Sequence, residues 1–176
     1  SGVVPIAHAS DGGGSIRMPA SNCGLFGFKP SRGRLAGNTG RKVFNLTVDH
    51  CVTHSVRDSA ALFAATEQSG RGALYRPVGL VSEPLGRKLR VGVVARSVSG
   101  AAPDPEVRAA VDGAVALIES LGHDVSETAW PVDEGFTQDF LVLWASGAYQ
   151  SVAATARALG RRPERSLFEP FTLSLV

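Results

Sequence analysis

Three consecutive glycines near the N-terminus, Gly12 to Gly14, constrain this chain more than any other stretch. An apolar run over residues 3–7 precedes them, so we expect a strand that ends just before the glycines. Glycine permits positive φ and lets another molecule approach the main chain closely. Ser15 follows directly, and residues 16–20 predict a short helical turn. We therefore expect the Ser15 hydroxyl beside unpaired backbone N–H groups, where an anion can bind.

A serine in this setting suits acyl transfer, because the hydroxyl supplies a nucleophile and the N–H groups stabilise an oxyanion. Ser15 is the candidate nucleophile. The candidate oxyanion donors are the main-chain N–H groups of Gly12, Gly13, Gly14 and Ser15. Asp11 and Arg17 flank the loop with opposite charges, and we expect them to support it through charge-assisted hydrogen bonds. The alternatives are a glycine-rich loop that only turns the chain and one that binds a phosphate.

The residues around Ser15 form a dense motif. It reads Asp11-x-Gly13-Gly14-Ser15-Ile16-Arg17-x-Pro19-Ala20 and continues as Gly24-x-x-Gly27-x-Lys29-Pro30-Ser31-x-Gly33-Arg34. This motif closely resembles the second half of the amidase signature, which defines a family of serine hydrolases acting on carboxamides. Residues 53–60 are similar to a helix start of that family, and residues 48–50 are similar to its branch of cyclic-dimer amide hydrolases. The resemblance implies an α/β fold with a mixed central sheet flanked by helices. It also implies a small-molecule linear amide substrate and no cofactor.

The resemblance places only part of the catalytic machinery in this sequence. The family uses a Ser–cis-Ser–Lys triad, of which Ser15 matches the nucleophile. The bridging serine belongs to a Gly-Gly-Ser-Ser-Gly-Gly motif upstream, and the lysine lies earlier still. Ser1 lacks the flanking glycines of that motif, and Lys29 belongs to the segment after the nucleophile. We therefore expect an internal fragment of an amidase that is inactive by itself.

The chain organisation follows from the breaks in its pattern. We expect residues 1–176 to be a fragment of a single amidase domain, with the nucleophile loop in 1–70 and a loop excursion at 71–88, where prolines and glycines interrupt any period. Residues 89–176 predict a β-α-β unit, with strands at 89–95 and 123–128, followed by a long helix over 136–159. Residues 30–47 have no period and predict a loop that either walls the substrate pocket or only connects two elements.

Three capping signals fix the expected helix ends. Ser55 and Asp58 predict a capping box for a helix that runs to Gly70. Asp104 is expected to cap the helix of the β-α-β unit, with a proline at its first position. Gly160 ends the long helix.

Composition excludes several classes of function. A net charge of +2 is too small to favour nucleic acid or an acidic membrane, and no apolar run is long enough to span a bilayer. We therefore expect a cytoplasmic protein without either partner. Cys23 and Cys51 build no disulfide framework. In an extended segment, His50 and His54 share a face while Cys51 points away, so we expect polar positions beside a strand and no metal site.

Two alternatives to an amidase come from other functional classes. The A subunit of a tRNA-dependent amidotransferase shares the amidase signature, although residues 30–54 do not resemble that subunit's version. A non-catalytic module whose glycine loop binds an anion is the other. For the fragment we also expect a bare apolar surface that favours self-association, with a homodimer as one form.

Overall fold

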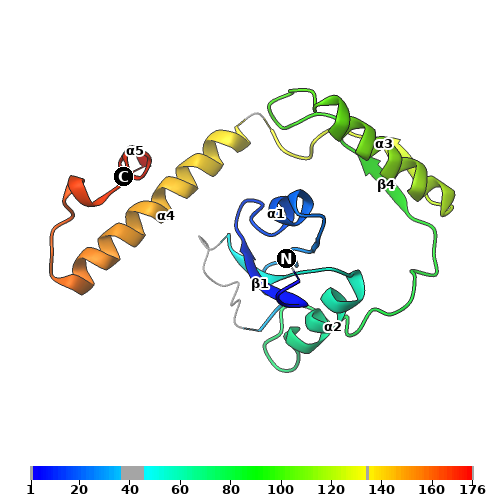
Figure 1. Cartoon of the computed structure of the whole chain (residues 1–176), viewed down its shortest axis with the longest axis horizontal. Helices are drawn as coiled ribbons and strands as arrows, with labels where there is room; N and C mark the ends of the chain where they lie inside the picture. The colour runs from blue at the N-terminus through cyan, green and yellow to red at the C-terminus, as the bar shows by residue number, and fades with distance from the viewer. Residues whose placement is uncertain (1, 37–45, 134, 176) are drawn as a thin grey trace. The chain divides into compact units, whose positions relative to one another are not determined.

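The computed structural model describes residues 2–36, 46–133 and 135–175. The chain divides into two compact units, here called the N-terminal unit (Ser1–Pro84) and the C-terminal unit (Leu85–Val176). The boundary lies inside the stretch 71–88, where prolines and glycines interrupt the sequence pattern. Strands and helices are present in both units (Figure 1), so the predicted α/β class is confirmed. The assignment of the whole chain to a single domain stays a prediction.

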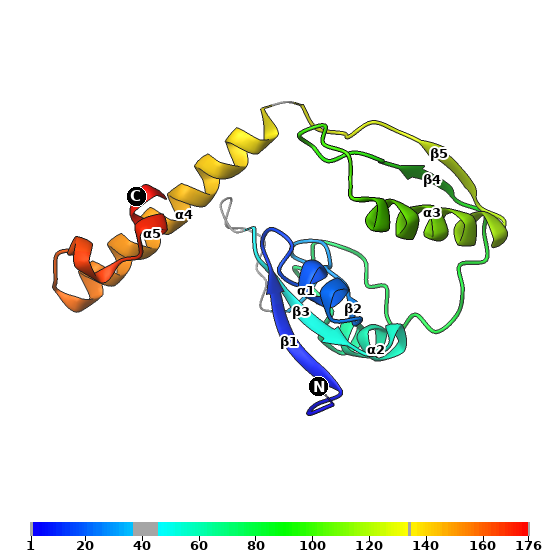
Figure 2. The ribbon, with the colours of Figure 1, turned by 45° about the horizontal axis from the view of Figure 1, so that its top comes forward.

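A three-stranded antiparallel sheet forms the centre of the N-terminal unit (Figure 2). Its order is β1 (Ile6–Asp11), β3 (Val48–Thr53) and β2 (Phe26–Gly27). Helices α1 (Arg17–Asn22) and α2 (Val56–Thr66) contact this sheet, α1 at β2 and α2 at both β2 and β3. The central strand is covered most completely, and four of its residues are buried: Val48, His50, Cys51 and Thr53. Both faces of β3 therefore lie in the core of this unit.

Strand β1 begins and ends later than the apolar run predicts. The sequence favours residues 3–7, whereas the strand runs from Ile6 to Asp11. Its register explains the difference, because Ile6 pairs with Thr53 and Asp11 pairs with Val48, so the length of β3 sets the length of β1. The half-buried positions of β1 include the small side chains of Ala7 and Ala9, which give a weak hydrophobic signal. The prediction that the glycines follow the end of a strand is confirmed.

Helix α2 starts as predicted but ends earlier. The Ser55 hydroxyl accepts the N–H of Asp58 at 3.1 Å, which confirms the N-cap. The helix ends at Thr66 rather than at Gly70. Glu67 is already extended and forms a β-bridge with Leu35, so a long-range contact stops the helix before the glycine is reached.

The C-terminal unit contains the predicted β-α-β arrangement. Strands β4 (Arg90–Val93) and β5 (Asp124–Glu127) pair in parallel, and α3 (Pro105–Ser120) connects them. Asp104 occupies the N-cap position of α3, but its side chain makes no capping hydrogen bond, so that part of the prediction is wrong. Helix α4 (Phe136–Leu159) has the predicted bounds and ends at Gly160, which has a φ of 61°. The short helices η1 (Arg165–Leu167) and α5 (Pro170–Leu175) follow.

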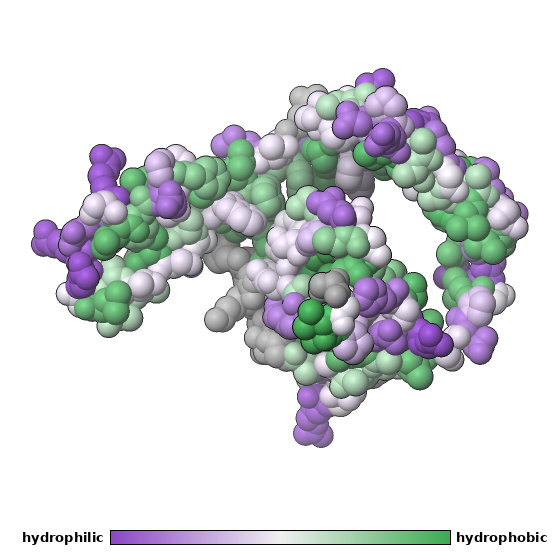
Figure 3. All heavy atoms as spheres, viewed as in Figure 1, coloured by the Kyte–Doolittle hydropathy of each residue, from purple (hydrophilic) through white to green (hydrophobic). Residues whose placement is uncertain are grey.

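Large apolar side chains are exposed on both units. Neither α3 nor α4 has a buried residue. Along α4, Phe136, Phe140 and Trp144 form a row of ring contacts, and Trp144 is 44% exposed. Apolar surface is visible on the face shown in Figure 3. Self-association through such surface remains a prediction. No helix among the described residues has the length and apolar character needed to cross a membrane.

A close approach at Gly27 ties the sheet to the segment that carries Ser15. A Cβ atom on Gly27 would lie 2.5 Å from the Ala20 Cβ and 2.9 Å from the carbonyl oxygen of Ile16. Real Cβ atoms do not tolerate such contacts, so β2 can pack against the start of α1 only with glycine at this position.

We expect Gly27→Ala to lower the free energy of unfolding by about 2 kcal/mol, because the start of α1 must move away from the sheet. Gly113→Ala is the matched control. An added Cβ there meets no atom within 4 Å, and alanine in a helix interior is favoured over glycine by roughly 0.5–1 kcal/mol. Denaturant unfolding of both variants measures the difference, and equal stability would contradict the close-packing interpretation.

Candidate active site

Ser15 lies in the turn between β1 and α1. The serine is exposed, whereas Gly14 and Ile16 on either side of it are buried. Ile16 is completely buried and anchors the turn in the core. The N–H of Met18 donates to the Gly14 carbonyl at 2.8 Å, which begins the helical hydrogen bonding directly after the serine. The fold therefore presents Ser15 at the surface of a firmly held turn.

The buried carboxylate of Asp11 holds this turn in place. Its Oδ1 accepts the N–H of Gly14 at 2.6 Å and the Arg17 Nη2 at 3.1 Å. Its Oδ2 accepts the N–H groups of Ile16 and Arg17 at 3.2 and 3.4 Å, and the Arg17 Nε at 2.9 Å. The Asp11 side chain is fully buried, while that of Arg17 is about half exposed. One carboxylate thus fixes the backbone on both sides of Ser15.

This hydrogen bonding keeps Asp11 charged. The Arg17 side chain is the largest cause of the lowered pKa of Asp11, and the N–H groups of Gly14 and Ile16 add to it. Burial acts in the opposite direction and is outweighed. The same contact raises the pKa of Arg17. Because the pKa of Asp11 is lower in the folded chain, its contribution to stability is present above the ordinary aspartate pKa and is lost as the pH falls.

The hydrogen bonds also change the list of oxyanion donors. The N–H of Gly14 donates to Asp11, so it is not free to bind a developing oxyanion. The Asp11 carboxylate accepts from the N–H groups of Gly14, Ile16 and Arg17 and not from those of Gly12, Gly13 and Ser15, which stay the predicted donors. The predicted set of four donors is therefore reduced to these three.

The glycines have different local roles. Gly14 has a φ of 128°, and a Cβ there would lie 2.8 Å from the Met18 Cε, so the turn requires glycine. Gly12 does not have a left-handed φ, and a Cβ there would meet the Thr47 Oγ1 at 3.4 Å, an ordinary contact. Thr47 precedes β3 and is distant from Gly12 in sequence. No pattern in the sequence places it against the glycine loop.

The end of the motif, at Arg34, is bound to the residue that caps the C-terminus of α2 and to the stretch that follows it. The Arg34 Nη1 donates to Glu67 Oε1 at 2.7 Å, and Glu67 Oε2 accepts the N–H groups of Val78 and Gly79. Arg34 also lies over the ring of Tyr75, 4.6 Å from its centroid. Residues 37–45 of the predicted loop lie outside the described residues. The alternatives of pocket wall and connector therefore both stay open.

The other residues that the sequence suggests as a base or as metal ligands are Lys29, His50, Cys51 and His54. Lys29 Nζ donates to the carbonyl oxygen of Pro30 at 2.9 Å. His50 and Cys51 are both buried in β3, and the strand ends before His54. The expectation of polar positions beside a strand is thus wrong for His50 and Cys51, because β3 is covered on both faces. Among the described residues, no three His, Cys, Asp or Glu side chains gather as metal ligands do.

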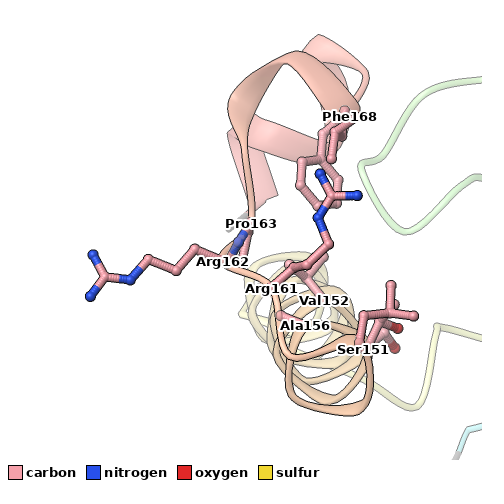
Figure 4. A pocket seen from close by; sticks show the side chains of 10 residues that line it. Ser151, Val152, Ala156, Arg161, Arg162, Pro163 and Phe168 are labelled. Atoms are coloured by element: carbon pink, nitrogen blue, oxygen red, sulfur yellow. The ribbon is translucent and has the colours of Figure 1, made fainter.

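A cavity of about 340 Å³ lies in the C-terminal unit, between the end of α4 and the segment that follows it. Figure 4 shows Arg161 beside this cavity and Arg162 pointing away from it. The cavity is mainly apolar, and none of the predicted site residues lines it. Its lining residues are Ser151, Val152, Thr155, Ala156, Leu159, Arg161, Arg162, Pro163, Leu167 and Phe168. The turn at Ser15 therefore stays the candidate active site that the sequence predicts.

Comparisons with known proteins agree with the motif around Ser15. The family model for Amidase matches residues 1–170, so the chain belongs to the amidase family. The chain is 42% identical to the "Putative amidase AmiC" of Mycobacterium leprae over 177 residues, covering 99% of this chain and 38% of that protein. It is 35% identical to the 6-aminohexanoate-cyclic-dimer hydrolase of Pseudomonas sp. (strain NK87), covering 89% of this chain and 34% of that protein.

Solved structures support the same assignment. The structure of a 6-aminohexanoate cyclic dimer hydrolase complexed with substrate matches with a TM-score of 0.80 and 31% identity, covering 98% of this chain and 38% of that one. A bacterial aryl acylamidase of the amidase signature family shares the fold, with a TM-score of 0.77. The chain spans less than two-fifths of the length of these relatives.

We expect Asp11→Asn to lower the free energy of unfolding by about 3 kcal/mol, because a buried amide cannot accept all of the hydrogen bonds that the carboxylate accepts. Asp112→Asn is the control, since Asp112 pairs with Arg108 on the exposed face of α3 at 2.9 Å and exposed pairs of this type are worth about 0.5 kcal/mol. Thermal and denaturant unfolding measure both effects. Equal losses would show that the Asp11 hydrogen bonds do not hold the turn.

Proposed function

We propose that the protein containing this chain is an amidase that hydrolyses a small carboxamide through a serine acyl-enzyme. Ser15 is the nucleophile of this proposal. The observation that carries it is an exposed serine in a turn whose backbone is fixed by a buried carboxylate. The names of the relatives, amidases and a cyclic-dimer hydrolase, support a carboxamide substrate, linear or cyclic.

The chemistry follows from the groups present in the turn. Amides are weak electrophiles, so the Ser15 hydroxyl must lose its proton to a base as its oxygen attacks the carbonyl carbon. The N–H groups of Gly12, Gly13 and Ser15 are the proposed donors to the resulting oxyanion, each worth about 3–4 kcal/mol in the transition state. Collapse of this intermediate breaks the C–N bond, and the amine leaves with a proton. Water then hydrolyses the ester on Ser15.

We further propose that the base lies outside these 176 residues. Lys29 already donates to the Pro30 carbonyl, and His50 lies in the core between β3 and α2. His8 is exposed and pairs with Asp49 at 3.8 Å. A Ser–cis-Ser–Lys arrangement, as the amidase signature implies, would supply both the base and the proton for the leaving amine.

Asp11 also bears on the non-catalytic alternative. In a loop that binds a free anion, the N–H groups are expected to point toward the ligand. Here the N–H groups of Gly14 and Ile16 bind the chain's own Asp11 carboxylate, which reduces the donors left for a phosphate. No observation favours the amidotransferase subunit, and it is not proposed.

We expect Ser15→Ala to reduce amide hydrolysis by the full-length protein about 10⁴-fold or more, because removal of a nucleophile leaves only binding and oxyanion stabilisation. The stability should change by no more than about 0.5 kcal/mol, since the side chain is exposed. Ser21→Ala in α1, also exposed, is the matched control and should retain activity. Activity of Ser15→Ala within tenfold of the wild type would refute the assignment.

The 176-residue chain alone should not react with a fluorophosphonate probe, because a serine without a base is a weak nucleophile at neutral pH. Mass spectrometry of the intact chain after treatment measures the labelling. The full-length protein is the positive control and should be labelled at Ser15. Stoichiometric labelling of Ser15 in the isolated chain would show that a working base lies within it.

A further inference from the structure

The core of the N-terminal unit contains a histidine that the proposed reaction does not use. His50 lies at the middle of β3 and is 4% exposed. Its Nε2 is 3.1 Å from the hydroxyl of Ser59 on α2, a residue that is also buried. The rings of Phe28 and Phe63 contact the imidazole edge-on, with centroids 5.9 and 6.2 Å away. The imidazole therefore joins the central strand to α2.

The second ring nitrogen decides which protonation state fits. Nδ1 is buried and has no hydrogen-bond partner among the described residues. A neutral imidazole carries a single N–H. It can form its hydrogen bond at Nε2 in either tautomer, because the Ser59 hydroxyl is able to donate or to accept. An imidazolium has an N–H at both nitrogens, and the one at Nδ1 would be buried beside aromatic rings without an acceptor. The surroundings therefore favour the neutral form.

Within the described part of the chain, the groups that contact this ring include no charged side chain that could compensate for its protonation. Across the sheet, His50 pairs with Ala9 of β1. The next residue, Cys51, is buried near the Ser59 hydroxyl, and burial raises the pKa of its thiol, so it stays uncharged. Asp49 precedes His50, and its carboxylate contacts His8 at 3.8 Å. Among the described residues, the Ser59 hydroxyl of α2 and the rings of Phe28 and Phe63 contact His50, and none of these groups carries a negative charge.

We propose that His50 is an acid-sensitive lock, which in its neutral form holds α2 against the central strand and loses this hold when protonated. The lock bears on the candidate site because β3 also pairs with β1, the strand that ends at Asp11. Loosening of α2 therefore weakens the sheet on which the turn at Ser15 is built. The inference concerns stability and does not depend on the proposed amidase activity.

The direction of the pH dependence follows from burial. Desolvation lowers the pKa of His50 below its ordinary value. At a pH below the unfolded pKa of about 6.5, the unfolded chain binds a proton that the folded chain resists. The stabilising contribution of neutral His50 is thus complete above that pH and declines as the pH falls from there toward the pKa of the folded state.

The test follows the histidine ring signals of the 176-residue chain by proton–carbon NMR from neutral to acid pH. His50→Gln assigns the signal of His50 by its disappearance, and His54→Gln does so for an exposed histidine next to the same strand. We expect the His50 signal to titrate below the ordinary histidine pKa of about 6.5, because burial disfavours the charged ring. Titration of His50 at or above the ordinary histidine pKa would overturn the proposal.

Thermal unfolding gives the second readout. Between about pH 7.5 and 5, the melting temperature of the wild type should fall by roughly 3 °C more than that of His50→Gln. His54→Gln should behave as the wild type. An equal fall in the melting temperature of the wild type and of His50→Gln would overturn the proposal.

Where His50→Gln does not fold, Ser59→Ala replaces it. Because the contact between His50 Nε2 and the Ser59 hydroxyl is proposed to favour the neutral ring, its loss should move the His50 titration toward the ordinary histidine value, and an unchanged titration or a shift further toward acid pH would contradict the lock.

Discussion

The rest of the site depends on the hydrogen bonds that the buried carboxylate of Asp11 accepts. It binds backbone N–H groups on both sides of Ser15 and the side chain of Arg17. Removal of such a group from water is costly, and only several hydrogen bonds and an opposite charge offset that cost. The turn therefore has one well-determined conformation in which Ser15 is exposed while its neighbours are buried. Preorganisation of this kind is what catalysis by backbone dipoles requires.

Much of the fold was predictable because its signals are local. Three features follow from short-range patterns or from a short crossover: the N-cap at Ser55, the bounds of α4 and the parallel pairing of β4 with β5. At two places where the prediction was wrong, the end of α2 and the bounds of β1, a long-range contact decided the outcome. Glu67 ends α2 early because it pairs with Leu35, and β1 extends to Asp11 because its partner strand does.

The candidate site shows the same division between local and long-range information. Ser15 and the flanking charges stand out in the sequence, because a glycine run beside a serine is unusual and the motif is dense. Which N–H groups are free is not readable there, since that depends on where the Asp11 carboxylate points. The interior position of His50 was also missed, because a polar residue in a short segment gives no sign that the strand is central.

The register between β1 and β3 has a consequence for which sequence changes this site tolerates. Side chains alternate faces along a strand, so a shift of one residue would turn Asp11 away from the glycine loop. Point substitutions on the exposed positions of β1 leave that alternation intact. A single-residue insertion or deletion in β1 reverses it. The segment before the glycines is therefore far more sensitive to a change in length than to a change in composition.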